Sequence, residues 1–146
     1  MIIFAAIAKS DYKINNILEI GTHNGRTASI LSRLFPKANI TTIDLEDNNP
    51  TFKNTYKRDT NFKLFIKNRN KLISQHKNIT FLQMNSLKLS LANNKIPEQD
   101  LIWVDGAHGY PIVSADITNS IKLMKKKSIL MCDDIWKKTR INDDMY

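Results

Sequence analysis

Apolar runs and stretches of helical periodicity alternate along this chain. Five short apolar runs predict β-strands, and they cover residues 17–20, 38–44, 79–84, 101–104 and 128–132. Between them, apolar side chains recur every three or four positions, which predicts helices after Gly25, over 62–73 and after Pro111. In the last helix, the expected buried face consists of Val113, Ile117, Ile121 and Met124, with the lysines at 125–127 near its carboxyl end.

Two shorter stretches carry weaker patterns. Ile2–Ala8 is apolar and predicts a short helix that packs on the sheet. The segment 46–59 is polar and contains a turn signal at Asp47–Pro50. Thr60 or Asn61 is the expected N-cap of the helix that follows.

The order of the elements predicts the fold class. Strands that alternate with helices are typical of an α/β domain, in which helices cover both faces of a parallel sheet. The alternation of Leu87, Leu89 and Leu91 favours a strand, but this region lies where a crossover helix is needed, so both interpretations stay open. At 146 residues, the sequence predicts one domain over 1–146, with its core over 14–135.

The first predicted strand ends in a turn that carries candidate ligand-binding residues. Gly21 and Gly25 lie in this turn, and a helical pattern begins directly after it. Glycine lets a ligand approach the backbone closely, and free N–H groups at a helix start point toward the crevice. Glu19 would repel a pyrophosphate but would attract the ammonium and sulfonium groups of S-adenosylmethionine. The charge pattern therefore favours that cofactor over NAD.

A second acid strengthens this interpretation. Asp44 ends the second predicted strand about twenty residues beyond the glycines, the spacing at which a strand-end acid meets ribose hydroxyls. The alternative is that the glycines only allow the backbone to turn, without binding a ligand, and that Glu19 is solvated. Together the two acids favour a ligand of the adenosine type. His23 and Arg26, in or beside the turn, either reach the cofactor carboxylate or are solvated.

Composition narrows the function classes. The net charge of +8 is accompanied by a bias toward Ile, Lys and Asn, which AT-rich coding produces without selection for a partner. Basic residues are densest over 53–77, but no basic motif interleaved with aromatics supports a nucleic-acid partner. The single cysteine, Cys132, excludes an intrachain disulfide and favours a reducing compartment. No apolar stretch is long enough to span a membrane, so we expect a cytoplasmic protein.

Four motifs together resemble a known family. They are E-I-G-x-x-x-G-R-T at 19–27, T-I-D-L at 42–45, D-L-I-W-V-D-G-A-H-G-Y at 100–110 and L-M-C-D-D at 130–134. In this order they resemble class I S-adenosylmethionine-dependent methyltransferases, in the small-molecule O-methyltransferase branch related to catechol O-methyltransferase. The resemblance runs from about residue 14 to residue 135. It implies a Rossmann-like doubly wound parallel sheet of about five strands, in the order 3-2-1-4-5.

The resemblance also implies site residues. Cofactor contacts would come from Glu19, Gly21, Thr22, Gly25, Asp44, Leu45, Asn85, Ser86 and Asp105. In metal-dependent members, Asp105, Asp133 and Asp134 would hold Mg²⁺, which favours oxygen ligands and can fix and activate a substrate hydroxyl. Asp105 and His108 would be the catalytic residues, with His108 as the base that takes the substrate proton. The alternatives are that Asp133 and Asp134 form a helix cap or a solvated turn, and that His108 only forms a hydrogen bond with the backbone at a helix start.

The chain departs from the family after its last predicted strand. Relatives continue with a helix and a β-hairpin, whereas this sequence ends twelve residues after Asp134. We therefore expect a truncated gene product, a homodimer that covers the exposed sheet edge, or a protein that has lost catalysis. The favoured function is metal-assisted O-methylation of a small hydroxylated molecule. The alternatives are a non-catalytic cofactor-binding remnant or interaction module, and a protein that binds or modifies nucleic acid.

Overall fold

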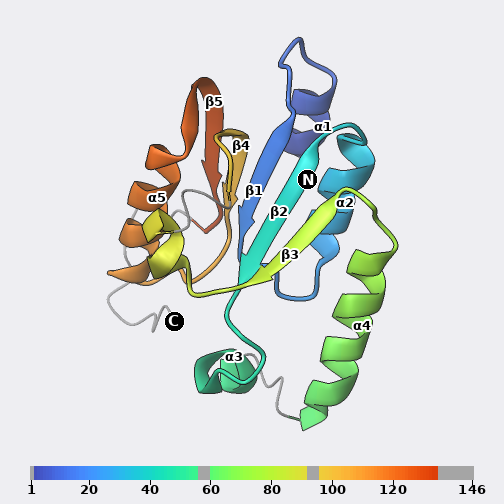
Figure 1. Cartoon of the computed structure of the whole chain (residues 1–146), viewed down its shortest axis with the longest axis vertical. Helices are drawn as coiled ribbons and strands as arrows, with labels where there is room; N and C mark the ends of the chain where they lie inside the picture. The colour runs from blue at the N-terminus through green and yellow to red at the C-terminus, as the bar shows by residue number, and fades with distance from the viewer. Residues whose placement is uncertain (1, 56–59, 92–95, 135–146) are drawn as a thin grey trace.

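Five parallel strands form one sheet in the order β3-β2-β1-β4-β5, as expected (Figure 1). The structure is a computed structural model that describes residues 2–55, 60–91 and 96–134. The strands are β1 (Asn16–Ile20), β2 (Asn39–Asp44), β3 (Ile79–Gln83), β4 (Gln99–Val104) and β5 (Met124–Cys132). The two central strands, β1 and β4, are almost wholly buried, because helices cover both faces of the sheet.

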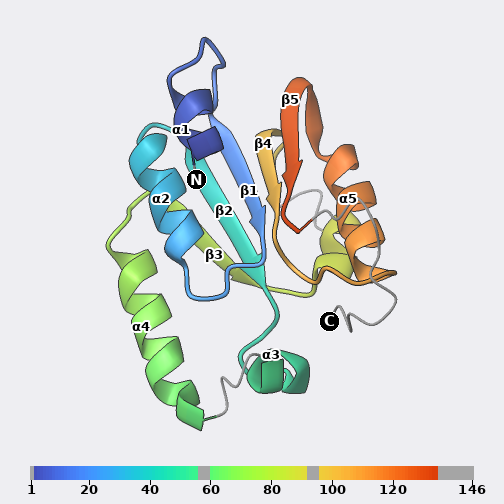
Figure 2. The same ribbon diagram turned by 180° about the vertical axis from the view of Figure 1, so that it is seen from behind.

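Two groups of helices cover the two faces of the sheet (Figures 1 and 2). One group contains α1 (Ile2–Ala8), α2 (Arg26–Leu34) and α4 (Phe62–Ser74), and the other contains the 3-10 helix η2 (Ser86–Leu91) and α5 (Ile112–Lys122). Alternate side chains of one strand enter different cores. Ile17 packs with Phe4 and Leu31, whereas Leu18 packs with Leu89 and Leu123. This confirms the predicted doubly wound α/β architecture.

The last helix and the last strand differ from the prediction. The buried residues of α5 are Asp116, Asn119 and Ser120, whereas Ile121 is 57% exposed. Met124 and the lysines at 125–127 belong to β5 and not to the end of the helix. The predicted buried face of this helix is wrong because apolar side chains continue to recur at helical spacing beyond Lys122, the residue at which the helix ends. The polar side of α5 instead packs on η2, where the Asn119 amide donates to the Ser86 carbonyl at 3.4 Å.

Two connecting segments contain helical turns. The sequence analysis did not predict one of them, and for the other it did not decide between a strand and a helix. Residues Pro50–Asn54 form the short helix α3, capped by the Asn49 side chain, where only a turn was expected. Leu87, Leu89 and Leu91 lie in η2, which settles the open choice between strand and helix. Only Leu89 of these three is buried. Asn61 takes the N-cap position of α4 but makes no side-chain capping hydrogen bond.

The amino ends of the central strands are fixed by one acid. The Asp100 carboxylate accepts hydrogen bonds from the backbone N–H groups of Asn15 and Asn16 and from Lys125 Nζ, at 2.8–2.9 Å. Burial alone would raise the pKa of Asp100, but these donors hold it below its ordinary value. Within the three described ranges, no helix has the length and apolar character that a membrane crossing would require.

Candidate functional site

The turn after β1 is held against the end of β4. Gly21 has φ +101°, and a Cβ at this position would lie 2.1 Å from the carbonyl oxygen of Asp105. The Gly21 N–H donates to Ile43 at 2.9 Å, and the Asp105 N–H donates to Ile20 at 2.8 Å. Only glycine allows this approach, so the carboxyl ends of β1, β2 and β4 meet at one place. This is the edge at which ligands bind in doubly wound folds.

Glu19 lies fully buried beneath this turn. Its Oε2 accepts a hydrogen bond from the Thr42 hydroxyl, and Thr42 Oγ1 lies 2.6 Å from the hydroxyl of Thr22. Its Oε1 has no hydrogen-bond partner among the described residues. Burial, followed by the nearby charges of Asp105 and Asp44, raises the pKa of Glu19 to about 8, against the opposing hydrogen bond from Thr42. The site thus has a buried carboxyl group with an unused acceptor.

Asp44 ties the end of β2 to the same turn. Its Oδ2 accepts the His23 N–H at 2.7 Å, and its Oδ1 accepts the Leu45 N–H at 2.8 Å. His23 has φ +47°, so this bond holds the turn in an uncommon backbone conformation. A carboxylate at the end of this strand has the position at which a strand-end acid meets ribose hydroxyls in doubly wound folds.

Gly25 serves helix packing. It has φ +78° at the N-cap of α2, and a Cβ there would lie 3.0 Å from Cγ1 of Ile73 in α4. A larger residue would push α2 away from α4. The structure therefore gives a packing reason for this glycine, and its predicted contact with the cofactor stays a prediction.

Asn85 and Ser86 lie at the carboxyl end of β3, next to an acid that the sequence analysis missed. The Asn85 side chain caps η2 by accepting the Leu87 N–H at 2.9 Å. Asp116 of α5 is 1% exposed. No described residue donates a hydrogen bond to either of its carboxyl oxygens. Burial raises its pKa, although the Ser86 hydroxyl is near enough to oppose that shift. The carboxyl also borders Gly106, at whose Cβ position Oδ2 would lie 3.4 Å away.

His108 lies between two of the predicted acids. Its Nδ1 is 3.0 Å from Asp134 Oδ2, and its Nε2 is 3.6 Å from Asp105 Oδ1. The Nε2 atom is buried without a hydrogen bond among the described residues. Asp105 Oδ2 accepts the indole N–H of Trp103 at 3.3 Å. Burial, followed by the charge of Asp133, raises the pKa of Asp105, and both Trp103 and His108 oppose this shift.

The predicted magnesium site does not fit this arrangement. Within 2–55, 60–91 and 96–134, no three His, Cys, Asp or Glu side chains are grouped closely enough to hold a metal ion. Asp133 is close enough to Asp105 to raise its pKa, but Asp134 is paired with His108. The structure therefore brings two of the three acids near each other and directs the third toward an imidazole.

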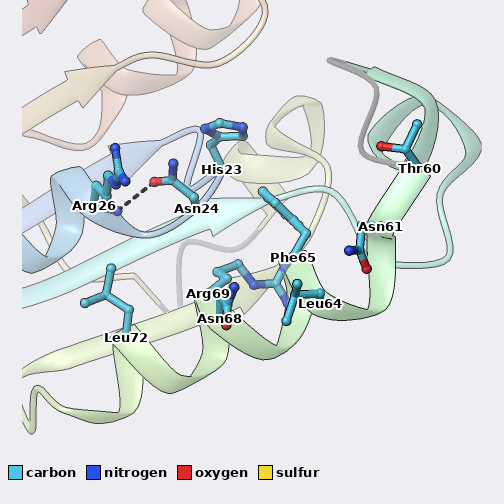
Figure 3. Close-up of a pocket in the computed structure, with 10 residues that line it drawn as sticks. All are labelled: His23, Asn24, Arg26, Thr60, Asn61, Leu64, Phe65, Asn68, Arg69 and Leu72. Atoms are coloured by element: carbon cyan, nitrogen blue, oxygen red, sulfur yellow. Dashed lines mark hydrogen bonds between the residues drawn. The ribbon is translucent and has the colours of Figure 1, made fainter.

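A cavity of about 510 Å³ opens beside the turn, between the start of α2 and the length of α4 (Figure 3). It is lined by His23, Asn24, Arg26, Thr60, Asn61, Leu64, Phe65, Asn68, Arg69 and Leu72. Of the residues considered for the cofactor, only His23 and Arg26, the two candidates for its carboxylate, line it. Sequence analysis did not find this cavity as a unit, because its walls come from two separate segments and no local motif marks their meeting.

A buried ion pair fixes the inner wall of this cavity. Arg69 is fully buried and binds Asp47 through two parallel hydrogen bonds of 2.7 and 2.9 Å. Its guanidinium carbon also lies 4.5 Å from the ring centroid of Phe81. Burial alone would raise the pKa of Asp47, but hydrogen bonds from Arg69 and Gln83 hold it below its ordinary value. Asp47 thus anchors a segment in which the sequence indicated only a turn.

Comparison with known proteins identifies the family of this domain. Residues 18–135 match the family model described as "Methyltransferase domain". The comparison with curated proteins gives no match. Similar solved structures include the S-adenosylhomocysteine-bound methyltransferase PaMTH1 of Podospora anserina, with a TM-score of 0.62 and 21% identity over 89% of this chain and 49% of that one.

Two further structures show the same fold. The fibrillarin pre-rRNA processing protein of Methanococcus jannaschii has a TM-score of 0.63 and 19% identity, over 88% of this chain and 50% of that one. An O-methyltransferase family protein of Burkholderia thailandensis has a TM-score of 0.57 and 14% identity, over 90% of this chain and 36% of that one. The chain thus spans half or less of the length of these three structures. The family match, the strand order and the acid-bearing turn agree, and the chain belongs to the class I S-adenosylmethionine-dependent methyltransferases.

Proposed function

We propose that this chain transfers a methyl group from S-adenosylmethionine to a hydroxyl of a small molecule. The observation that carries the proposal is the buried Glu19 carboxyl, whose Oε1 has no partner among the described residues at the carboxyl edge of the sheet. A buried polar group without a partner is costly, and a cationic donor would satisfy it. S-adenosylmethionine carries such a donor, its ammonium group, and no phosphate.

The remaining cofactor contacts follow from the same edge. Gly21 and Thr22 would border the methionine end, Asp44 and Leu45 the ribose, and Asn85 and Ser86 the adenine. Asp105, beside Gly21 and His108, would lie nearer the reacting methyl group. The cofactor supplies an activated methyl group on a positively charged sulfur. The contribution of the protein is then to orient the acceptor oxygen toward that methyl group and to remove its proton.

His108 is suited to remove that proton. Asp134 lies 3.0 Å from Nδ1, so a proton on Nδ1 would fix the ring and leave Nε2 as the acceptor. Nε2 is buried and makes no hydrogen bond to a described residue, and it lies 3.6 Å from Asp105 Oδ1. In the proposed reaction, the acceptor hydroxyl gives its proton to Nε2 while its oxygen takes the methyl group. The positive charge of the sulfonium is thereby replaced by that of the imidazolium.

The finer predictions from the sequence stay predictions. Metal assistance would require the three acids to converge, which the described arrangement does not do. Unchanged turnover after treatment with a chelator would support the histidine-based proposal. Turnover that is lost with the chelator and restored by Mg²⁺ would support the metal-assisted alternative. A small hydroxylated acceptor, a homodimer over the β5 edge and a cytoplasmic location stay predictions as well.

Calorimetric titration with S-adenosylmethionine tests the cofactor part of the proposal. We expect saturable binding by the unaltered chain and at least tenfold weaker binding by Asp44→Ala, because the variant loses both the ribose acceptor and the bond to His23. Asp11→Ala removes an exposed acid elsewhere and serves as the control. If a folded sample releases no heat, the proposed function fails. Binding without turnover on any hydroxylated acceptor would instead favour the non-catalytic remnant.

A further inference from the structure

The cavity between α2 and α4 is separate from the edge assigned to the cofactor. Its lining residues come from the outer side of the turn, from the start of α2 and from α4 (Figure 3). The two sites share only the turn, since His23 lines the cavity while its backbone N–H binds Asp44. A volume of about 510 Å³ is within the range of small-molecule sites.

The charged residues that line this cavity are basic. None of its ten lining residues is acidic, and two are arginines. The charge of Arg69 is neutralised by Asp47, which leaves Arg26 as the exposed cation. No carboxylate within the described ranges lies at ion-pair distance from Arg26. The side chains of Asn61 and Asn68 also line the cavity, and their amides can supply further donors (Figure 3).

The α4 wall of the cavity carries its apolar side chains. Leu64, Phe65 and Leu72 line it from α4, and Leu64 is 47% exposed. Arg26 and Asn24 lie across from Leu72, at the start of α2 (Figure 3). A molecule that filled the cavity would meet the guanidinium of Arg26 at the start of α2. From the α4 side it would meet aliphatic and aromatic carbon, with the amides of Asn61 and Asn68 beside it.

We propose that this cavity binds a small anionic molecule in which a carboxylate or phosphate is attached to an apolar body. The guanidinium of Arg26 pairs with the anion in the two-pronged geometry that planar oxyanions favour. Leu64, Phe65 and Leu72 pack against the apolar body, and the amides of Asn24 and Asn68 fix its orientation. The inference does not depend on the methyltransferase proposal.

Titration of the full chain with phenyl phosphate, followed by NMR, tests this inference. We expect saturable binding, and about tenfold weaker binding by Arg26→Gln, because one charge-assisted contact is lost. Arg33→Gln is the matched control, since Arg33 is an exposed arginine of the same helix that does not line the cavity. Leu64→Ser should weaken the binding of phenyl phosphate several-fold and leave that of inorganic phosphate unchanged.

Three results would overturn the inference. The first is a linear, non-saturating response to phenyl phosphate. The second is an equal loss of binding in Arg26→Gln and Arg33→Gln, which would mean general attraction to a basic chain. The third is displacement of phenyl phosphate by S-adenosylmethionine, which would make the cavity part of the cofactor site. Failure of S-adenosylmethionine to bind at all would count against the proposed function and leave this inference intact.

Discussion

The hydroxyl of Thr42 on β2 donates a hydrogen bond to the carboxyl of Glu19 on the neighbouring strand β1. The two residues face each other in the register of the sheet, and both are fully buried. Thr42 also reaches Thr22 in the turn. The protonation of Glu19 is therefore linked through two hydroxyl groups to the loop that would hold the cofactor.

Glu19 should make stability depend on pH. Its pKa is about 8 in the folded chain against an ordinary value of 4.5, so the folded state binds the proton more tightly than the unfolded state. The free energy of unfolding should therefore fall as pH rises from 4.5 to 8, by at most about 1.4 kcal/mol per pH unit, and then level off. Urea unfolding of Glu19→Gln should show a flatter pH dependence than the unaltered chain. Parallel curves for the two proteins would contradict the assignment.

Gly21 and Gly106 should respond differently to the same change. In Gly21→Ala, the new Cβ meets the Asp105 carbonyl at 2.1 Å and the φ angle is unfavourable, so we expect a loss of about 2 kcal/mol or more. In Gly106→Ala, the nearest atoms lie at 3.4 Å, an ordinary contact, so the loss should stay below about 1 kcal/mol. Urea unfolding of both variants compares the two. Equal effects would show that the turn can move away from β4.

The Asp47–Arg69 pair should be important for stability. Asp47→Ala leaves the guanidinium of Arg69 fully buried without its carboxylate, which should cost about 3 kcal/mol. In Arg69→Met with Asp47→Ala, no unpaired charge remains, so part of the loss should be recovered. Denaturant unfolding of the single and double variants measures this difference. A single variant as stable as the unaltered chain would mean that water reaches Arg69 easily.

His108→Gln should separate chemistry from binding. If His108 takes the acceptor proton, kcat should fall at least about 100-fold, while the affinity for S-adenosylmethionine changes little. Asp134→Asn should lower kcat less, because the ring keeps a hydrogen-bond partner. Tyr110→Phe is a control, since Tyr110 is 87% exposed. An equal kcat in His108→Gln and the unaltered chain would rule out the proposed base.

Most of the fold could be predicted because buried parallel strands leave a clear pattern. The run at 17–20 is apolar at three of its four positions, and Gly21 marks its end, so β1 and its turn were evident from the sequence. The buried face of α5 could not be predicted in the same way. Its polar residues Asp116 and Asn119 are covered by η2, a contact with a distant segment that no local periodicity records.

The sequence indicated at which edge of the sheet the candidate site lies, but not how its side chains contact one another. The spacing of Glu19 and Asp44 indicated the carboxyl ends of β1 and β2 correctly. The role of Gly25 in packing against Ile73, and the turn of Asp134 toward His108, depend on how distant segments meet. Such contacts are properties of the tertiary structure, which a reading of local spacing does not include.

Buried acids at the two ends of the sheet differ in whether the chain supplies them with hydrogen-bond donors. At the amino end, Asp100 is fully supplied with donors by the chain itself. At the carboxyl end, Glu19 and Asp116 are buried with oxygens that no described residue satisfies. Any molecule that donates hydrogen bonds there would bind the folded state and not the unfolded one, and would raise the melting temperature. In this domain, occupation of the site and stability of the fold are therefore expected to be thermodynamically linked.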